Sequence, residues 1–389
     1  MKRVALVLVG SRRVNRRTCR FLEGLASSGF APTVVAVPRR AWETSGVEQP
    51  ELLARRGFVV ASAGSNAAGV RLVVCMHWSV LPVALLVGAV CRAPVLYDEH
   101  DHYEVLALEA SGPAWLNRVR SAVVALVHRV ALPRVDLVTC IHLTDGSLRT
   151  HLARRASQVV ELHNYPSRRW FGAAVSPEAD ANREVALVYL GGIWAEKGCG
   201  VAVDAFELLR ADPAAPPCAL HVFGQGDPTI EAKLRATPGV TFHGLASSDE
   251  ILRLLASRPC VGLVLLDATP RYATVSTNCH KLFEYLAAGV PVVATDVGDL
   301  ARIVGELDGG WVINPGYTPS ELASLFASIL SLPGEIRRRG AAASAAMAAQ
   351  DLSWEHEWAG LEPLLPLMEP EVAPVGPALV QAPDQVPDQ

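Results

Sequence analysis

Residues 278–299 read NCHKLFEYLAAGVPVVATDVGD, and this stretch decides the fold. Lys281 and Glu284 lie in a predicted helix that ends at Gly289, and the apolar run after Pro291 predicts a buried strand. A helix followed directly by a buried strand is typical of a parallel α/β sheet. The start of such a helix favours anions, because its free N–H groups point outward. A carboxylate there suits hydroxyl groups, so the segment indicates a ligand that carries both phosphate and a diol.

The composition is that of a large globular protein. The chain has 389 residues, of which 50% are hydrophobic, and this is enough for two domains. The formal net charge of −4 gives no indication of nucleic-acid binding. The eight cysteines include no C-x-x-C pair and several lie in apolar runs, which predicts buried free thiols in a reducing compartment. We therefore expect a cytoplasmic protein and assign no metal ligands.

Short apolar strands alternate with amphipathic helices along almost the whole chain. This alternation predicts two doubly wound parallel (Rossmann-like) sheets, and ligands of such sheets bind at the carboxyl ends of the strands, here in the cleft between two domains. The first series of strands is predicted at Val4–Val9, Thr33–Val37, Gly57–Ala61, Leu72–Cys75, Pro94–Tyr97, Leu137–Ile141 and Val159–Leu162, and the second at Ala186–Leu190, Ala219–Phe223, Val240–His243, Val261–Leu265, Val292–Thr295 and Trp311–Ile313.

A polar, turn-rich stretch separates the two series of strands. Near the end of the chain, Trp354 and Trp358 are four residues apart, which gives a last helix an apolar face that can clamp the domains together. The residues after it are rich in Pro, Val, Gln and Asp, which is typical of disorder. We predict an N-terminal domain at 1–167, a linker at 168–183, a C-terminal domain at 184–352, a bridging helix at 353–368 and a disordered tail at 369–389.

Three glycine-containing turns follow strands of the second series. Residues 189–200 read YLGGIWAEKGCG, where Gly191 and Gly192 allow close approach of a phosphate and Lys197 supplies positive charge. Gly224 and Gly226 lie in a similar turn, and His243 and Gly244 are candidates for the wall of a base pocket. Ordinary tight turns would give the same patterns. No complete G-x-G-x-x-G or Walker A motif is present.

Residues 98–102 read DEHDH directly after a predicted strand. Five ionisable side chains at a strand's carboxyl end suit a general base, a sugar-binding histidine or metal ligands. Asp98, Glu99 and His100 are the candidates on the acceptor side, together with Arg16 from a cluster of arginines after the first strand. Hydrogen-bonded loop residues are the alternative interpretation.

Two features suggest contact with a membrane surface. The arginines at positions 12, 13, 16, 17 and 20 suit a phosphorylated acceptor or an anionic membrane. Residues 115–132 have the pattern of a basic amphipathic helix, which can lie on a bilayer. A solvated helix face and a core helix are the alternatives. Residues 72–91 have the length of a membrane span, but His77 and Pro82 favour a strand, a turn and a helix.

Together these motifs resemble the family 4 glycosyltransferases of the GT-B fold, over about residues 1–365. The specific part is the pair of stretches GGIWAEKG and KLFEYLAAGVPVVATD. VNRRTCRFLEGLASSGFAPTVVAV, APVLYDEHDHYE and WEHEW also resemble stretches of that family.

The resemblance implies a retaining hexosyltransferase that uses a nucleoside diphosphate sugar, with UDP or GDP sugars expected, and neither a cofactor nor an essential metal. It implies that Lys197 binds the diphosphate, that Glu284 binds the ribose hydroxyls and that His100 contacts the donor sugar. Amides near Asn278 would hold the phosphates, with Lys281 as a supporting charge. The expected acceptor is a lipid-linked or glycan intermediate or a small natural product.

Three positions depart from the family pattern. Ser276 stands where the first of two glutamates is expected, and Gly192 stands where an arginine is common. Cys279 and His280 also differ, and a protonated His280 would restore part of the missing positive charge. Two other hypotheses therefore stay open. One is a catalytically degenerate GT-B partner protein, and the other is a nucleotide-sugar isomerase or metal-dependent hydrolase that uses residues 98–102.

Overall fold

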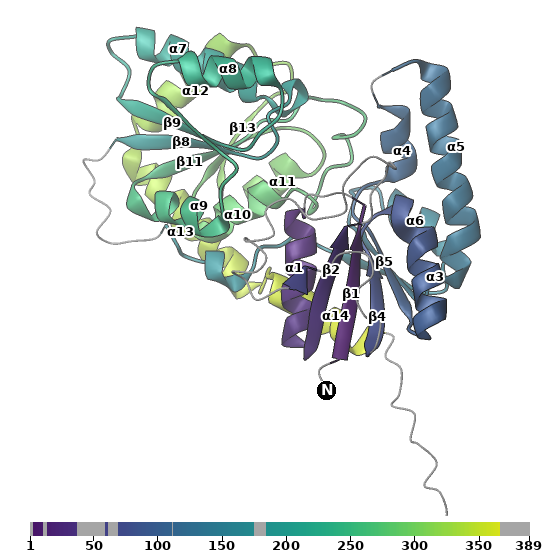
Figure 1. Ribbon diagram of the computed structural model, residues 1–389. Coiled ribbons are helices and arrows are strands. Elements are labelled where there is room, and N and C mark those ends of the chain that lie inside the picture. Colours follow the sequence, from purple (N-terminus) through teal and green to yellow (C-terminus); the bar gives the residue numbers. More distant parts are fainter. Residues whose placement is uncertain are drawn as a thin grey trace, which may run out of the picture.

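The computed structural model describes residues 3–10, 14–36, 59–60, 69–110, 112–174 and 184–365, which form two parallel sheets (Figure 1). The first sheet has seven strands in the order β3-β2-β1-β4-β5-β6-β7, and the second has six in the order β10-β9-β8-β11-β12-β13. The strand order reverses beside β1 and beside β8, so each sheet is doubly wound. The predicted fold class is confirmed.

Each predicted strand is present in the sheet to which the sequence assigned it. The largest difference within the described residues is at β2, which begins three residues earlier than predicted, and most of the predicted strand at 57–61 lies outside them. The strands are β1 (Arg3–Val9), β2 (Phe30–Ala36), β3 (Val59–Val60), β4 (Val70–Cys75), β5 (Val95–Glu99), β6 (Leu137–Ile141), β7 (Val159–Leu162), β8 (Val185–Leu190), β9 (Cys218–Phe223), β10 (Val240–Gly244), β11 (Cys260–Val264), β12 (Val292–Thr295) and β13 (Gly310–Ile313).

Helices cover both faces of each sheet, which explains why the strands read as continuous apolar runs. In the first sheet, α1 and α14 cover one face, and α3, α5 and α6 cover the other. In the second sheet, α9, α10, α11 and α13 cover one face, and α7, α8 and α12 cover the other. The helices are α1 (Arg16–Ser27), α3 (Leu81–Cys91), α4 (Tyr103–Leu108), α5 (Ala114–Ala131), α6 (Ser147–Ala153), α7 (Cys199–Ala211), α8 (Pro228–Ala236), α9 (Ser248–Ser257), α10 (His280–Ala288), α11 (Leu300–Glu306), α12 (Pro319–Leu330), α13 (Pro333–Ala349) and α14 (Trp354–Leu361).

The segment that decided the fold has the predicted order of helix, glycine stop and buried strand. Gly289 ends α10 in the left-handed region with φ 87°, and Tyr285 and Leu286 accept hydrogen bonds at this end. A residue with a side chain is strained at that φ, so glycine fits the stop. β12 follows at once and is buried along its whole length. The start of α10 therefore lies beside the carboxyl end of β11.

The last helix packs against the first sheet, although α13, which precedes it, packs on the second. Trp354 and Trp358 of α14 both contact the ring of Phe21. Nε1 of Trp354 donates a hydrogen bond to the carbonyl of Arg20. A Cβ on Gly24 would lie 2.2 Å from the Trp358 ring, so α1 needs a glycine there. The chain therefore crosses from one sheet back to the other at its end.

All eight cysteines are free and six of them are buried, as the sequence predicted. Burial raises the pKa of the Cys75 and Cys260 thiols to about 12. Within the described ranges, the helices lack the combination of length and apolar character that crossing a bilayer requires. Residues 72–91 are divided between the end of β4 and α3, as expected.

Candidate functional site

Hydrogen bonds join the two domains directly at the carboxyl ends of their strands. Asn164, just after β7, donates from its backbone N to the carbonyl of Thr277 and from Nδ2 to the carbonyl of Asn278, each at 3.0 Å. Thr144 donates its backbone N–H to the carbonyl of Thr274 at 3.2 Å. The segment that precedes α10 therefore lies against the N-terminal domain.

The turn after β8 places a lysine at the start of α7. Gly191 has φ 127° and open space where a Cβ would stand, and Lys197 comes two residues before the first helical residue. Gly198 has φ 68°, and a Cβ there would lie 2.6 Å from Leu265, so α7 begins against the end of β11. The first N–H groups of a helix have no partner inside it and attract anions. This corner is therefore suited to phosphate.

A second lysine, Lys281 of α10, is buried in the same corner. Its Nζ lies 4.5 Å from the centre of the Tyr189 ring and has no hydrogen-bond partner among the described residues. Burial lowers the pKa of Lys281 to about 8, with a further contribution from the charge of Lys197. Burial also lowers the pKa of Lys197, followed by the charge of Arg271. An anion stabilises a buried ammonium group, so this corner is suited to a negatively charged ligand.

The indole ring of Trp194 occupies the space into which a side chain at position 192 would point. A Cβ on Gly192 would lie 2.8 Å from Nε1 of Trp194 and 3.3 Å from Nζ of Lys197. The hydroxyl of Tyr189 holds this turn by donating to the carbonyls of Gly192 and Lys197, at 2.8 and 3.2 Å. An arginine at Gly192 would have to displace Trp194, which is half exposed.

Gly224 and Gly226 are explained by the packing of two loops. A Cβ on Gly224 would lie 1.8 Å from the carbonyl O of Gly191, and one on Gly226 would lie 2.0 Å from that of Ile193. The backbone of Ile193 accepts from Asp227 at 2.7 Å. These two glycines let the neighbouring loops touch, which needs no ligand. A direct role in nucleotide binding stays a prediction for both.

His243 is part of a stack of rings. Its ring lies 4.0 Å from that of Phe223 with the planes 5° apart, and it also stacks on His221 at 5.3 Å. Gly244 has φ 68° and accepts from the N–H of Gly224 at 2.7 Å. One face of the His243 ring is therefore already covered by protein, so only its other face remains for a base.

Glu284 is buried in α10 and is paired with two arginines of α1. Nη2 of Arg20 donates to Oε1 at 3.0 Å, and Arg16 makes an ion pair with Oε2. Nη1 of Arg20 donates to Nδ1 of His280 at 2.8 Å and to the carbonyl of Asn164 at 2.9 Å. Burial, Arg16 and Arg17 together lower the pKa of Arg20 to about 9. The carboxylate thus joins the two domains as well as facing the predicted ribose site.

His280 does not supply the positive charge that the sequence suggested. Burial, followed by the charges of Arg20 and Arg17, lowers the pKa of His280 well below its usual value. The ring is therefore neutral at physiological pH and accepts a hydrogen bond from Arg20. Lys281 and not His280 is the additional cation near Lys197.

His100 follows β5 and is held by three neighbours. Its Nε2 lies 2.7 Å from the hydroxyl of Tyr103 and 3.3 Å from Nδ2 of Asn15, and its Nδ1 lies 3.7 Å from Oδ2 of Asp98. The side chain retains 16% of its exposure. Both ring nitrogens of His100 therefore have protein neighbours, and its contact with the donor sugar stays a prediction.

Asp98 and Glu99 are placed differently from the prediction. β5 continues through both residues, and neither side chain has any exposed surface. Oδ1 of Asp98 accepts from Nη2 of Arg17 at 2.7 Å, and Glu99 contacts the hydroxyl of Tyr97. Both carboxylates are therefore used inside the protein, and a direct contact of either with an acceptor stays a prediction.

Ser276 also has no exposed surface. Its hydroxyl donates to Oδ2 of Asp299 at 2.6 Å, and its N–H donates to Oδ1 of Asn278 at 2.8 Å. A glutamate at position 276, where the family pattern has one, would therefore lie beside the carboxylate of Asp299, which carries the same charge. A direct contact of Ser276 with the donor stays a prediction.

The main structural role of the arginine cluster was not predicted from the sequence. Arg17 is 1% exposed and donates from Nη1 to Asn164 at 2.7 Å, so it connects Asp98 to the domain contact. Arg16 and Arg20 face Glu284, and positions 12 and 13 lie outside the described residues. Arg17 and Arg20 are three residues apart, which places them on one face of a helix. This spacing was the feature of the sequence from which a shared role could have been predicted. Tyr103, Asn15 and Trp194 had no such signal.

Part of the chain is similar to a known family and to a curated relative. Residues 184–331 match the family described as "Glycosyl transferases group 1". A D-inositol 3-phosphate glycosyltransferase of Jonesia denitrificans is 29% identical over 189 residues, which are 47% of this chain and 42% of that protein. The matched part is therefore less than half the length of this curated relative.

Solved structures match over nearly the whole chain. Anabaena HepE in complex with UDP-glucose covers 93% of this chain and 99% of its own, with a TM-score of 0.66 and 15% identity. Sucrose-phosphate synthase from Thermosynechococcus elongatus covers 93% and 98%, with a TM-score of 0.63 and 17% identity. WaaG, a glycosyltransferase involved in lipopolysaccharide biosynthesis, covers 93% and 99%, with a TM-score of 0.62 and 16% identity. At these identities the likeness shows the fold.

Proposed function

Residues 184–331 belong to the group 1 glycosyl transferases within a chain of the GT-B fold, and from this premise we propose that the protein transfers a sugar, with retention, from a nucleoside diphosphate sugar to a hydroxyl group. One observation carries the proposal. Two lysines, Lys197 and Lys281, lie near the start of α7 beside an open glycine turn, and the Nζ of Lys281 has no hydrogen-bond partner among the described residues. A diphosphate supplies the anion that this corner lacks.

We place the remaining predicted site residues around this corner, each with a role in binding the donor. Glu284 at the start of α10 accepts from ribose hydroxyls, because a carboxylate has about four acceptor positions and the arginines use only some of them. His100, from the other domain, contacts the sugar. Arg271 pairs with Asp101 across the domains at 3.4 Å and adds charge near Lys197. We therefore propose that residues of both domains bind the same nucleotide sugar.

The chemistry follows from charge compensation. The bond between the sugar's anomeric carbon and the phosphate oxygen breaks, and its electron pair goes to the phosphate. Lys197, Lys281 and the N–H groups of α7 neutralise the charge that develops there. The acceptor oxygen bonds to the same carbon from the same face, and its proton passes to the departing phosphate oxygen. No side chain has to form a covalent intermediate.

The first experiment is a thermal-shift and calorimetric screen of UDP, GDP, TDP and ADP sugars. We expect one donor class to raise the melting temperature, because a ligand that binds only the folded state stabilises it. We also expect slow hydrolysis of that donor with EDTA present. Lys197→Ala should weaken binding about tenfold or more, since a hydrogen bond to a charged group contributes about 1.5–3 kcal/mol. Lys233→Ala is the control, because Lys233 pairs with Asp204 on the surface.

The alternatives give different results in the same screen. Binding without turnover would support the degenerate partner protein instead. Equal affinity of the wild type and Lys197→Ala would overturn the site. The hydrolase hypothesis required residues 98–102 to converge on a metal, but Asp98 and Glu99 are buried, His100 faces Tyr103 and His102 faces His151 at 5.5 Å.

We further propose that the protein contacts an anionic membrane through α3 and α5, which lie side by side on the outer side of the N-terminal domain (Figure 1). Many large apolar side chains of these two helices are exposed to water, which is unfavourable for a face that only solvent covers. Exposed arginines of α5 border them. The exposed apolar residues are Val83, Leu86 and Val90 of α3, and Trp115, Val119, Val123, Leu126 and Val130 of α5. An acceptor linked to a lipid would lie on this side.

Vesicle flotation tests the membrane contact. We expect the protein to float with vesicles rich in phosphatidylglycerol and less with pure phosphatidylcholine. Leu86→Ser/Leu126→Ser should reduce partition at least about tenfold, because each buried leucine contributes about 1.5–3 kcal/mol. Leu208→Ser on α7, a leucine that is also exposed, is the control. Unchanged flotation of the double variant, or its conversion of a dimer into a monomer, would contradict the proposal.

A further inference from the structure

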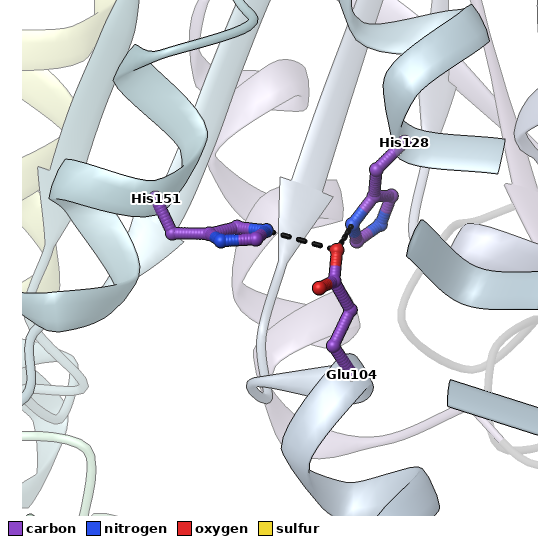
Figure 2. Close-up of side chains that lie close together, drawn as sticks. All are labelled: Glu104, His128 and His151. Atoms are coloured by element: carbon purple, nitrogen blue, oxygen red, sulfur yellow. Dashed lines mark hydrogen bonds and ion pairs between the residues drawn. The ribbon is translucent and has the colours of Figure 1, made fainter. Parts of the chain in front are cut away.

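Three side chains from three helices of the N-terminal domain lie close together. Figure 2 shows Glu104 of α4 between His128 of α5 and His151 of α6. Oε1 of Glu104 lies 3.2 Å from Nδ1 of His128 and 2.9 Å from Nε2 of His151. The ligand atoms of all three lie within 4.8 Å of one another. Two imidazoles and a carboxylate are a donor set that zinc-class cations prefer.

The far side of His128 has the partner that metal-bound histidines usually have. Its Nε2 lies 3.5 Å from Oε2 of Glu99 and 3.3 Å from the hydroxyl of Tyr97. A carboxylate that accepts from Nε2–H keeps the lone pair on Nδ1, which is the nitrogen that faces Glu104. His128 and Glu99 are both buried, so this orientation is fixed.

The charges of the cluster are unbalanced in protein alone. Glu99 and Glu104 both face His128, and no described lysine or arginine makes an ion pair with either carboxylate. The site thus attracts positive charge strongly, and a dication balances two carboxylates with both imidazoles neutral.

We propose that Glu104, His128 and His151 bind one divalent cation of the zinc class. Tetrahedral zinc with ligand bonds of about 2.0–2.1 Å places its ligand atoms about 3.3 Å apart. The two contacts of Glu104, at 3.2 and 2.9 Å, already approach that spacing. The fourth position is open to water or to His102, whose ring lies 5.5 Å from that of His151.

One positive group must move aside. Nη1 of Arg155 lies 3.0 Å from Nε2 of His151 and donates toward it. Arg155 is only four residues further along the chain and lies at the edge of the cluster, where a change of side-chain rotamer frees the nitrogen. Cation binding therefore exchanges an arginine contact for a metal bond at His151.

The cation would tie α4, α5 and α6 together, and its role is structural. Glu104 follows Tyr103, whose hydroxyl holds Nε2 of His100 at 2.7 Å. Fixing α4 thereby fixes the neighbour of His100. The cation itself takes no part in sugar transfer, so the proposal stands or falls independently of the proposed function.

Metal content of untagged protein tests the site. Protein purified from zinc-supplemented medium should contain about one zinc ion per chain by mass spectrometry, and a dipicolinate wash should lower its melting temperature. His151→Gln, at a partly exposed position, should lose the zinc while keeping an amide that can donate to Glu104. His142→Gln, near Glu161 at 3.5 Å and outside the cluster, should keep it.

A cobalt titration separates coordination from loose association. Apoprotein with cobalt should develop the intense visible bands of a tetrahedral N/O site, and these bands should be absent in Glu104→Gln and His151→Gln. Zinc content and cobalt spectra that are the same in the wild type and in His151→Gln would overturn the proposal. So would a wild type that retains no zinc after dialysis against zinc-containing buffer and a desalting step.

Discussion

Lys281→Met is expected to make the ligand-free protein more stable and its nucleotide affinity lower. The Nζ of Lys281 is buried without a hydrogen-bond partner among the described residues, and burial lowers its pKa from 10.5 to about 8. A displacement of that size corresponds to about 3 kcal/mol of destabilisation at neutral pH. Methionine fills a similar volume without charge, so the free energy of unfolding should rise by about that amount. Denaturant unfolding measures it.

The same substitution should weaken binding of the donor nucleotide about tenfold to hundredfold, because a hydrogen bond to a charged group is lost. Opposite signs for stability and affinity distinguish a ligand-binding lysine from a structural one. Lys233→Met is the matched control and should leave affinity unchanged, since Lys233 lies on the surface beside Asp204 and Glu207. A Lys281→Met protein that is less stable and binds normally would refute the assignment.

The titration of Lys281 also has a defined sign. Its folded pKa lies below the unfolded value, so the penalty is fully present below about pH 8 and is relieved as pH rises from there toward 10.5. The difference in stability between Lys281→Met and wild type should therefore shrink over that interval. Nucleotide-sugar affinity should run the other way, falling by up to about tenfold per pH unit above pH 8, because binding then requires uptake of a proton.

Glu284→Gln is expected to lose both nucleotide affinity and stability. The carboxylate holds Arg20, whose side chain is only 7% exposed, and removing its charge leaves that arginine buried without compensation. Breaking a buried pair in this way costs about 3–5 kcal/mol of unfolding free energy. Loss of the charged acceptor for ribose hydroxyls should weaken nucleotide binding about tenfold or more. Calorimetry and denaturant unfolding measure the two effects separately.

A double variant separates the two roles of Glu284. Arg20→Met/Glu284→Gln removes the stranded charge and should regain most of the lost stability, yet nucleotide binding should stay weak. Glu306→Gln, a surface glutamate that pairs with Arg302, is the control and should change neither quantity measurably. Recovery of nucleotide affinity together with stability in the double variant would assign Glu284 a purely structural role.

The contacts of Glu284 and Lys281 explain how far sequence reasoning reached. Both residues were located from one helix, because the apolar spacing, the glycine stop and the following strand are local signals. The partners of Glu284 come from α1, about 264 positions away, and no local pattern records them. The same is true of Ser276, whose hydroxyl is taken by Asp299.

The charged residues at 98–102 were predicted to face a ligand, but the side chains of Asp98 and Glu99 are buried. Five ionisable residues in a row indicate a solvated strand end, yet β5 continues to Glu99 because Arg17 and His128 neutralise its acids inside the protein. Likewise the arginines of α1 suggested an anionic ligand, and their partners are Asp98 and Glu284. Composition alone cannot tell an internal pair from a binding surface, because burial depends on what packs opposite.

The sequence by itself determined the two doubly wound sheets, because strand burial, helix period and glycine stops are properties of neighbouring residues. Only the tertiary structure decided which charges are free and which are paired. Among the described residues, it left the Nζ of Lys281 without a hydrogen-bond partner, gave Glu284 two arginines and brought Glu104, His128 and His151 together from separate helices. Electrostatic partners interact through space, so the order of these residues along the chain does not show how close they lie in the folded protein.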